Sequence, residues 1–96
     1  MEWLVTYDVA VETAEGRRRL RRVAKTCEAH GQRVQYSVFE CRLTDGQFAV
    51  LWARLLDVID KETDSLRAYR LPESRDRFLQ VAGKSLPYDI RGTLLV

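Results

Sequence analysis

The alternation of two hydrophobic periodicities along the chain constrains its fold more than any other feature. Residues 3–9, 33–43 and 64–71 are rich in β-branched and aromatic side chains, which is typical of strands. Residues 15–30 and 45–60 instead place apolar side chains three and four positions apart, which predicts two helices. The order of these segments predicts an α+β sandwich, in which two helices cover one face of a mainly antiparallel sheet.

Both predicted helices have recognisable ends. Thr13 can cap the first helix, and Thr44 or Asp45 the second, because a side-chain oxygen can accept a hydrogen bond from a free backbone N–H. Gly16 is a mild defect within the first helix, and Gly31 is predicted to end it as a C-terminal cap. The apolar faces comprise Leu20, Val23, Ala24 and Cys27 in the first helix, and Phe48, Leu51, Trp52, Leu55 and Ile59 in the second.

The second β-rich segment leaves two interpretations open. A ferredoxin-like fold requires a hairpin within residues 33–43, but no Gly, Asn or Pro marks a turn there, so a single long, bent strand is the alternative. Continuous alternation along one strand would place Val34, Tyr36 and Val38 on one side, with Phe39 on the other.

The C-terminal part of the chain is predicted to hold two short strands, at residues 77–82 and 90–96, joined by a loop at 83–89.

No linker or repeat divides the chain, so residues 1–96 are predicted to form one domain. A domain of this size leaves much apolar surface in water, which dimerisation would cover. No run approaches about 20 apolar residues, so no membrane span is expected, and the N-terminus is predicted to be a strand rather than a signal peptide.

The chain has two cysteines and one histidine, and these do not form a recognisable metal motif. Cys27 and Cys41 are not spaced as a CxxC pair, and His30 does not complete a zinc site with them. The two cysteines are therefore predicted to be buried thiols in a reducing cytosol. His30 lies at the predicted end of the first helix, where it is expected to act as a capping group rather than as a general base.

Positive charge is concentrated in one segment, although the net charge of the chain is only +2. Residues 17–33 carry seven basic side chains against one acidic one, whereas residues 1–16 carry four acidic side chains and no basic ones. Such a cluster is typical of a phosphate-binding surface, and a solvated helix face is the alternative. The predicted nucleic-acid-binding residues are Arg17, Arg18, Arg19, Arg21, Arg22, Lys25 and Arg33.

Three stretches of sequence, together with the basic helix and the order of elements, resemble a known family. They are VTYDV at residues 5–9, GQRVQYSVFECRL at 31–43, which is the most specific of the three, and DSLRAYRL at 64–71. In these features the chain resembles the CRISPR-associated endoribonuclease family. The resemblance implies a ferredoxin-like fold and a homodimer, with the C-terminal strand at 90–96 extending the partner's sheet.

The resemblance also implies a catalytic and metal-binding role for Asp8, which matches the family's Asp at the end of the first strand. In the dimer the two copies of this residue face each other across a cleft and hold a divalent metal, for which Mg²⁺ is expected and Mn²⁺ is the alternative. Mg²⁺ commonly takes one or two carboxylates, with water and substrate phosphate completing its shell. Glu12 and Glu40 are candidate helpers. The alternative from the residues alone is that Asp8 begins a turn.

Four aromatic side chains could stack on bases or belong to the core or the dimer interface. They are Tyr7, Tyr36, Phe39 and Tyr69, of which Phe39 and Tyr7 are the candidates for a cleft role.

Three functions follow as hypotheses. The first is a metal-dependent endonuclease of RNA, or of double-stranded DNA, that acts in CRISPR spacer acquisition in the cytoplasm of a prokaryote. The second is a non-catalytic dimeric adaptor that binds DNA and bridges dimers of the CRISPR integrase subunit. The third is a ferredoxin-like regulatory domain that binds a small molecule. The sequence does not choose between RNA and DNA.

Overall fold

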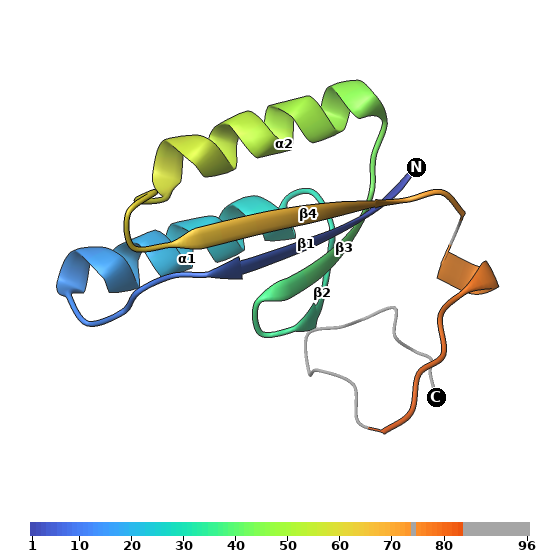
Figure 1. Cartoon of the computed structure of the whole chain (residues 1–96), viewed down its shortest axis with the longest axis horizontal. Coiled ribbons are helices and arrows are strands. Elements are labelled where there is room, and N and C mark those ends of the chain that lie inside the picture. Colours follow the sequence, from blue (N-terminus) through green and yellow to red (C-terminus); the bar gives the residue numbers. More distant parts are fainter. Residues whose placement is uncertain (74, 84–96) are drawn as a thin grey trace.

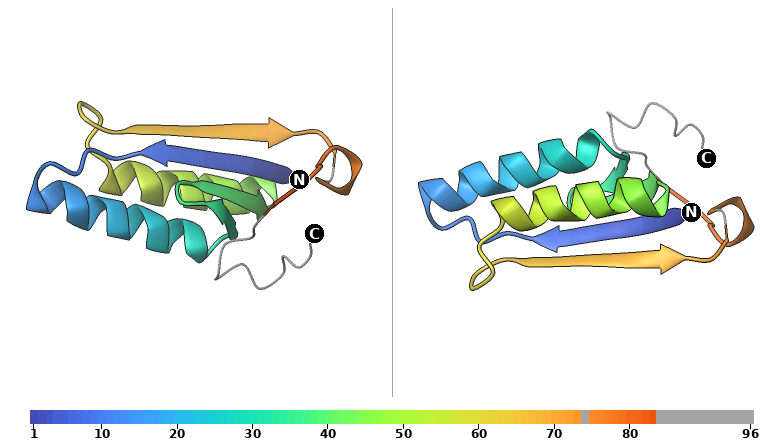
Figure 2. Two further views of the ribbon diagram at one scale, coloured as in Figure 1. Left: turned by 90° about the horizontal axis from the view of Figure 1, so that it is seen from below. Right: turned by 90° about the horizontal axis from the view of Figure 1, so that it is seen from above.

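Four antiparallel strands form one sheet in the order β2-β3-β1-β4, and two helices cover one of its faces (Figures 1 and 2). The structure is a computed structural model, and it describes residues 1–73 and 75–83. This is the ferredoxin-like order of strands and helices, so the predicted α+β sandwich is confirmed. The elements are β1 (Glu2–Asp8), α1 (Ala14–Glu28), β2 (Gln32–Gln35), β3 (Val38–Arg42), α2 (Asp45–Val58), β4 (Ser65–Leu71) and the short 3₁₀ helix η1 (Arg75–Arg77).

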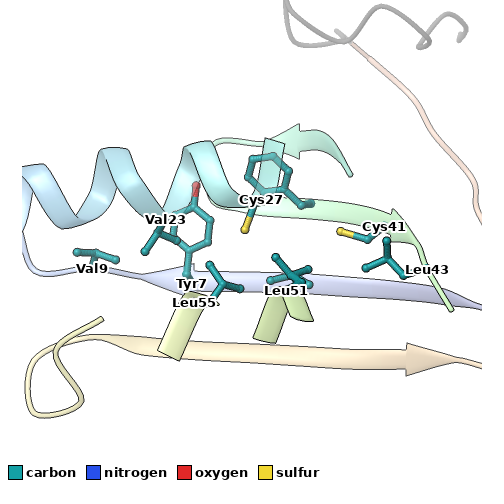
Figure 3. Close-up of a cluster of buried hydrophobic side chains, with 10 residues drawn as sticks. Tyr7, Val9, Val23, Cys27, Cys41, Leu43, Leu51 and Leu55 are labelled. Atoms are coloured by element: carbon teal, nitrogen blue, oxygen red, sulfur yellow. The ribbon is translucent and has the colours of Figure 1, made fainter. Parts of the chain in front are cut away.

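The core lies between the sheet and the two helices (Figure 3). On β1, Val5 and Tyr7 face the helices, whereas Asp8 is exposed, because alternate residues of a strand point to opposite faces. The fully buried side chains are Val5, Val23, Cys27, Phe39, Cys41, Leu51 and Leu55. Burying each large aliphatic or aromatic side chain stabilises the fold by roughly 1.5–3 kcal/mol, so this layer fixes how the helices sit on the sheet.

Residues 32–42 form a hairpin, and the alternative of one long bent strand is wrong. β2 ends at Gln35 and β3 begins at Val38, so Tyr36 and Ser37 form the turn. Two bonds from Tyr7 hold this turn: its hydroxyl donates to the Tyr36 carbonyl at 3.2 Å, and its backbone N–H donates to the Ser37 carbonyl at 3.2 Å. Tyr36 therefore lies outside both strands instead of sharing a strand face with Val38. The tertiary bonds explain how a turn without Gly or Asn is held.

Two glycines have roles other than the predicted ones. Gly16 is buried, and a Cβ atom at this position would collide with the backbone carbonyl of Ala10, so Gly16 is required by the close approach of two backbones. Gly31 is not the helix cap, because α1 ends at Glu28 with Ala29 as its C-cap. A Cβ atom at position 31 would instead overlap Cys41. Both glycines are therefore required because another segment of the same chain approaches their backbone closely.

The prediction of a strand at residues 77–82 is wrong. Residues 75–77 form η1, and the described residues that follow it, up to Gly83, contain no strand. A strand requires a neighbour to complete its hydrogen bonds, and none of the four strands of the sheet pairs with this segment. Phe78, Leu79 and Val81 remain exposed. The predicted strand at 90–96, and the loop from residue 84 onward, lie outside the described residues.

Within the part of the chain that the structure describes, neither helix has the length and hydropathy that a membrane crossing requires.

Candidate nucleic-acid interface

Asp8 lies at the end of β1, in a groove formed by three separate parts of the chain. It is exposed and aligns with Ser65 of β4 in the sheet. The groove has a volume of about 440 Å³ and is called the Asp8 groove here. It is lined by Tyr7, Asp8 and Val9 from the end of β1, by Leu20, Arg21 and Ala24 from α1, and by Arg33, Tyr36 and Ser37 from the hairpin. The fold thus brings together four predicted site residues, namely Tyr7, Asp8, Arg21 and Arg33.

Arg33 forms one wall of this groove and is held in place by its neighbours. Its guanidinium lies 3.8 Å from the carboxylate of Glu28, 3.5 Å from the Tyr7 hydroxyl, and 5.0 Å above the ring of Phe39. Only 14% of its side chain is exposed. Arg33 therefore contributes positive charge to the groove from a fixed position.

The predicted cleft role of Phe39 is wrong. Its side chain is fully buried, and its ring stacks on that of Tyr7 with centroids 6.2 Å apart. The turn at residues 36–37 sets the alternation of β3, which directs Phe39 and Cys41 towards the helices. A ring inside the core cannot stack on a base in the groove.

Tyr7 belongs mainly to the core, and only its hydroxyl end takes part in the groove region. The side chain is buried, which raises the pKa of its phenol, and nearby Arg33 opposes this shift only in part. The phenol is therefore protonated at neutral pH. It acts as a hydrogen-bond donor to the hairpin turn rather than as a base.

Tyr36 is the aromatic residue that the groove presents to solvent. It is 76% exposed and lines the groove together with Asp8. From the sequence alone Tyr36 is not distinguished from Tyr7, Phe39 and Tyr69, because the position of the turn could not be recognised. Recognising the two-residue hairpin loop at Tyr36 and Ser37 would have identified Tyr36 as exposed, because residues of such a loop lie outside the core.

A metal at Asp8 would need ligands beyond those that the described residues of a single copy supply. Asp8 is the only acidic residue among the nine that line the groove. Among the described residues, no three His, Cys, Asp or Glu side chains are grouped so that they could hold a metal ion. Glu12 is exposed beyond the end of β1, and Glu40 lines a different cavity. The hard carboxylate oxygen of Asp8 suits Mg²⁺ or Mn²⁺, but the described residues of one chain supply only this carboxylate to the groove.

The basic side chains of α1 divide into two groups. The first group is exposed and lines two shallow grooves, of about 560 Å³ and 360 Å³, on either side of Arg22 and Lys25. Arg54 of α2, which the sequence analysis missed because it stands alone among apolar residues, lines the smaller groove. We call this area the basic surface, and it comprises Arg18, Arg21, Arg22, Lys25 and Arg54.

The second group consists of Arg17 and Arg19, whose side chains donate to other parts of the same chain. The Nε of Arg19 donates to the carboxylate of Asp64 at 2.9 Å, and the Asp64 side chain is fully buried. Burial would raise the pKa of Asp64, but hydrogen bonds from Arg19 and from the backbone N–H groups of Asp60 and Ala10 outweigh it and lower the pKa to about 2. Arg17 donates to the carbonyl of Val11 at 3.1 Å. Arg19 thus joins α1 to the segment before β4 instead of contributing to the basic surface.

The buried thiols and the histidine take no part in the groove. Cys27 and Cys41 are free and fully buried, as predicted, and burial raises the pKa of Cys27 to about 12 and that of Cys41 to about 11. His30 lies 2.9 Å from the carbonyl of Thr26 through its Nδ1, which agrees with the predicted capping role. It lines a cavity different from the one that holds Asp8.

Comparison with known proteins gives the same result from sequence and from structure. The family described as "CRISPR associated protein Cas2" matches residues 1–77. The chain is 48% identical over 93 residues to CRISPR-associated endoribonuclease Cas2 1 of Moorella thermoacetica, and 50% identical over 93 residues to CRISPR-associated endoribonuclease Cas2 of Chlorobaculum tepidum; in each case 97% of both chains is covered. The crystal structure of Streptococcus pyogenes Cas2 at pH 6.5 superimposes with a TM-score of 0.77 at 51% identity, covering 86% of this chain and all (100%) of that one.

Proposed function

The chain belongs to the CRISPR-associated protein Cas2 family, and we propose that it is a metal-dependent endonuclease that acts in CRISPR spacer acquisition. Relatives over nearly the whole chain are named endoribonucleases, and the Halalkalibacterium halodurans relative, 42% identical over 92 residues, is named an endonuclease. The observation that carries the proposal is the position of Asp8, an exposed carboxylate in a groove that also holds Arg21 and Arg33.

Each charged residue of the groove has a separate proposed role in binding and positioning a phosphodiester. Arg21 can pair with a phosphate oxygen through its planar guanidinium, and Arg33 adds positive charge from a fixed position. The carboxylate of Asp8 would hold a Mg²⁺ or Mn²⁺ ion against the same phosphate. Such an ion polarises the phosphoryl group and lowers the pKa of a bound water. The neutral Tyr7 hydroxyl keeps the hairpin turn beside Asp8.

The proposed active unit is a homodimer, which would supply the second Asp8. Both described helices lie on one face of the sheet, and the opposite face, towards which the alternation of β1 directs Asp8, carries no described helix (Figure 2). Leu4 lies on that face with its register partner Tyr69, which is 45% exposed. Apolar side chains in this position are suited to packing against a second copy. In the same proposal, residues 90–96 extend the partner's sheet.

The test is cleavage of labelled single-stranded RNA and double-stranded DNA with Mg²⁺, with Mn²⁺ or with excess chelator. We expect metal-dependent cutting by the wild type and a loss of roughly 100-fold or more in D8N, because Asn keeps the size of Asp8 but removes its charge. Light scattering should show that both proteins are dimers. Equal cutting rates for the wild type and D8N would refute the role of Asp8.

A non-catalytic adaptor is the second candidate, and the extent of the basic surface favours it. This surface continues along α1 and onto α2, away from Asp8. Arginine and lysine contacts of this kind bind the phosphates of any sequence and would suit a dimer that holds DNA and bridges integrase dimers.

Spacer acquisition separates these two functions. If the adaptor role is the biological one, D8N should acquire spacers and bind duplex DNA normally. A folded wild type that binds duplex DNA without cutting it would also favour the adaptor role. A wild type that binds no nucleic acid at any salt concentration would instead favour the regulatory domain that binds a small molecule.

A further inference from the structure

The tip of the β2–β3 hairpin presents one aromatic side chain to solvent beside the Asp8 groove. Tyr36 is 76% exposed, which is more than any other large hydrophobic side chain among the described residues. It lines the same groove as Asp8 and Arg21. An exposed aromatic ring next to the guanidinium groups of Arg21 and Arg33 suits a ligand with both a flat apolar face and a negative charge, and a nucleotide has both.

The backbone of the turn at Tyr36 is held by the neighbouring strand β1. Its carbonyl accepts from the Tyr7 hydroxyl at 3.2 Å, and the carbonyl of the next residue, Ser37, accepts from the Tyr7 backbone N–H at 3.2 Å. Tyr7 directly precedes Asp8 in β1, so one strand positions both the turn and the carboxylate. The turn that carries the base-binding side chain is therefore arranged before the ligand arrives, which reduces the backbone entropy lost on binding.

The size and lining of the groove suit one nucleotide unit. Its volume of about 440 Å³ lies within the range of small-ligand pockets, which is roughly 300–1,000 Å³. Leu20, Ala24 and Val9 supply an apolar floor, and the guanidinium groups of Arg21 and Arg33 supply the charge. A base can therefore lie on Tyr36 while its phosphate lies towards Arg21.

We propose that Tyr36 stacks on an unpaired nucleobase and so directs single-stranded nucleic acid into the Asp8 groove. In a duplex both faces of each base are covered by its neighbours, whereas the unpaired bases of a single strand are free to stack on an aromatic side chain. The basic surface binds phosphates of either form, and Tyr36 adds the preference for single strands. This proposal rests on the proposed function, because it places the strand beside the residue that would cut it.

The test is binding of a short, labelled single-stranded RNA, measured by fluorescence anisotropy with excess chelator so that nothing is cut. Y36A should bind about 5- to 150-fold more weakly than the wild type, which is the range for losing one base–aromatic stack. Y36F and Y36W should stay within about threefold of the wild type, because they keep the ring. Y36L, which keeps apolar bulk without a ring, should resemble Y36A.

The matched ligand is an oligomer of the same length in which every nucleotide is abasic. The wild type should bind this abasic oligomer as weakly as Y36A binds the single-stranded RNA. Y36A should bind the abasic oligomer and the RNA with equal affinity. Affinity for duplex DNA should be equal in the wild type and Y36A.

Three outcomes would overturn the proposal: unchanged affinity of Y36A for single-stranded RNA, an equal loss for duplex DNA, or a monomeric Y36A, which would make Tyr36 a contact between copies. A wild type that cuts nothing with Mg²⁺ or Mn²⁺ but shows the expected Tyr36 pattern would refute the nuclease and leave this binding site standing.

Discussion

Arg19 and Arg22 lie one turn apart on α1, yet the fold gives them opposite surroundings. Arg19 faces the segment before β4 and donates to the buried carboxylate of Asp64 at 2.9 Å. Arg22 is exposed and lines two shallow grooves with Lys25. One arginine therefore stabilises the tertiary structure, and the other is available for a ligand. A run of basic residues in a sequence can thus serve two purposes at once.

The largest expected effect on folding comes from removing the carboxylate of Asp64. D64A leaves the Arg19 guanidinium and the N–H groups of Ala10 and Asp60 without their acceptor. Breaking a buried ion pair by removing one partner typically costs about 3 kcal/mol or more. The free energy of unfolding in urea, measured at one fixed protein concentration, should fall by about that amount.

The control for this change is the exposed ion pair of the same helix. Arg18 and Glu15 lie 4.0 Å apart with both side chains largely exposed. E15A should change the free energy of unfolding by less than about 0.5 kcal/mol. Equal losses in E15A and D64A would contradict the distinction between the exposed and the buried ion pair of α1.

Acid should remove the contribution of Asp64 in a defined range of pH. The pKa of Asp64 is lowered from 3.8 to about 2 in the folded chain, so its charged form stabilises the fold above about pH 4. That contribution, about 2 kcal/mol, should be lost as the pH falls from about 4 to about 2. Urea unfolding across this range should show the loss in the wild type, while the corresponding part of the pH dependence should be absent in D64A. Parallel curves for the two proteins would contradict the role of Asp64.

The smallest expected effect belongs to a single residue of the basic surface. R22Q should weaken binding of double-stranded DNA roughly fivefold at about 0.15 M salt and reduce the salt slope by about 1, because one phosphate contact is lost. Titrations at several salt concentrations measure both quantities. Its free energy of unfolding should stay within about 0.5 kcal/mol of the wild type.

The matched control is K61Q, which removes the same charge from the exposed turn before β4. It should leave the salt slope unchanged. If K61Q and R22Q weakened binding equally, net charge rather than the basic surface would explain the affinity.

Much of the fold and part of the site could be predicted from local sequence patterns. The apolar stripes predicted both helices, and the caps at Thr13 and Thr44 have the expected geometry. Three of the strand regions were found as β-rich stretches. The position of Asp8 at the end of β1 and the basic side of α1 follow from the same patterns. These features depend on residues close together in the chain, where spacing alone determines which face a side chain occupies.

The errors arose where a distant residue decides the outcome. The turn at Tyr36 is held by Tyr7, which belongs to another strand. Because the chain turns at this point, Phe39 lies in the core and Tyr36 lies in solvent. The requirement for glycine at position 31 comes from the approach of Cys41. No local pattern contains this information.

The sequence by itself therefore determined the α+β class, the elements and the concentration of charge on α1, because period and composition act within one segment. Only the tertiary structure decided which of those charges are engaged and which are free to bind, as Arg19 and Arg22 show. The physical reason is that a side chain's burial and hydrogen-bond partner are set by whatever packs beside it. For Arg19 that neighbour is Asp64, which stands 45 positions away in the sequence.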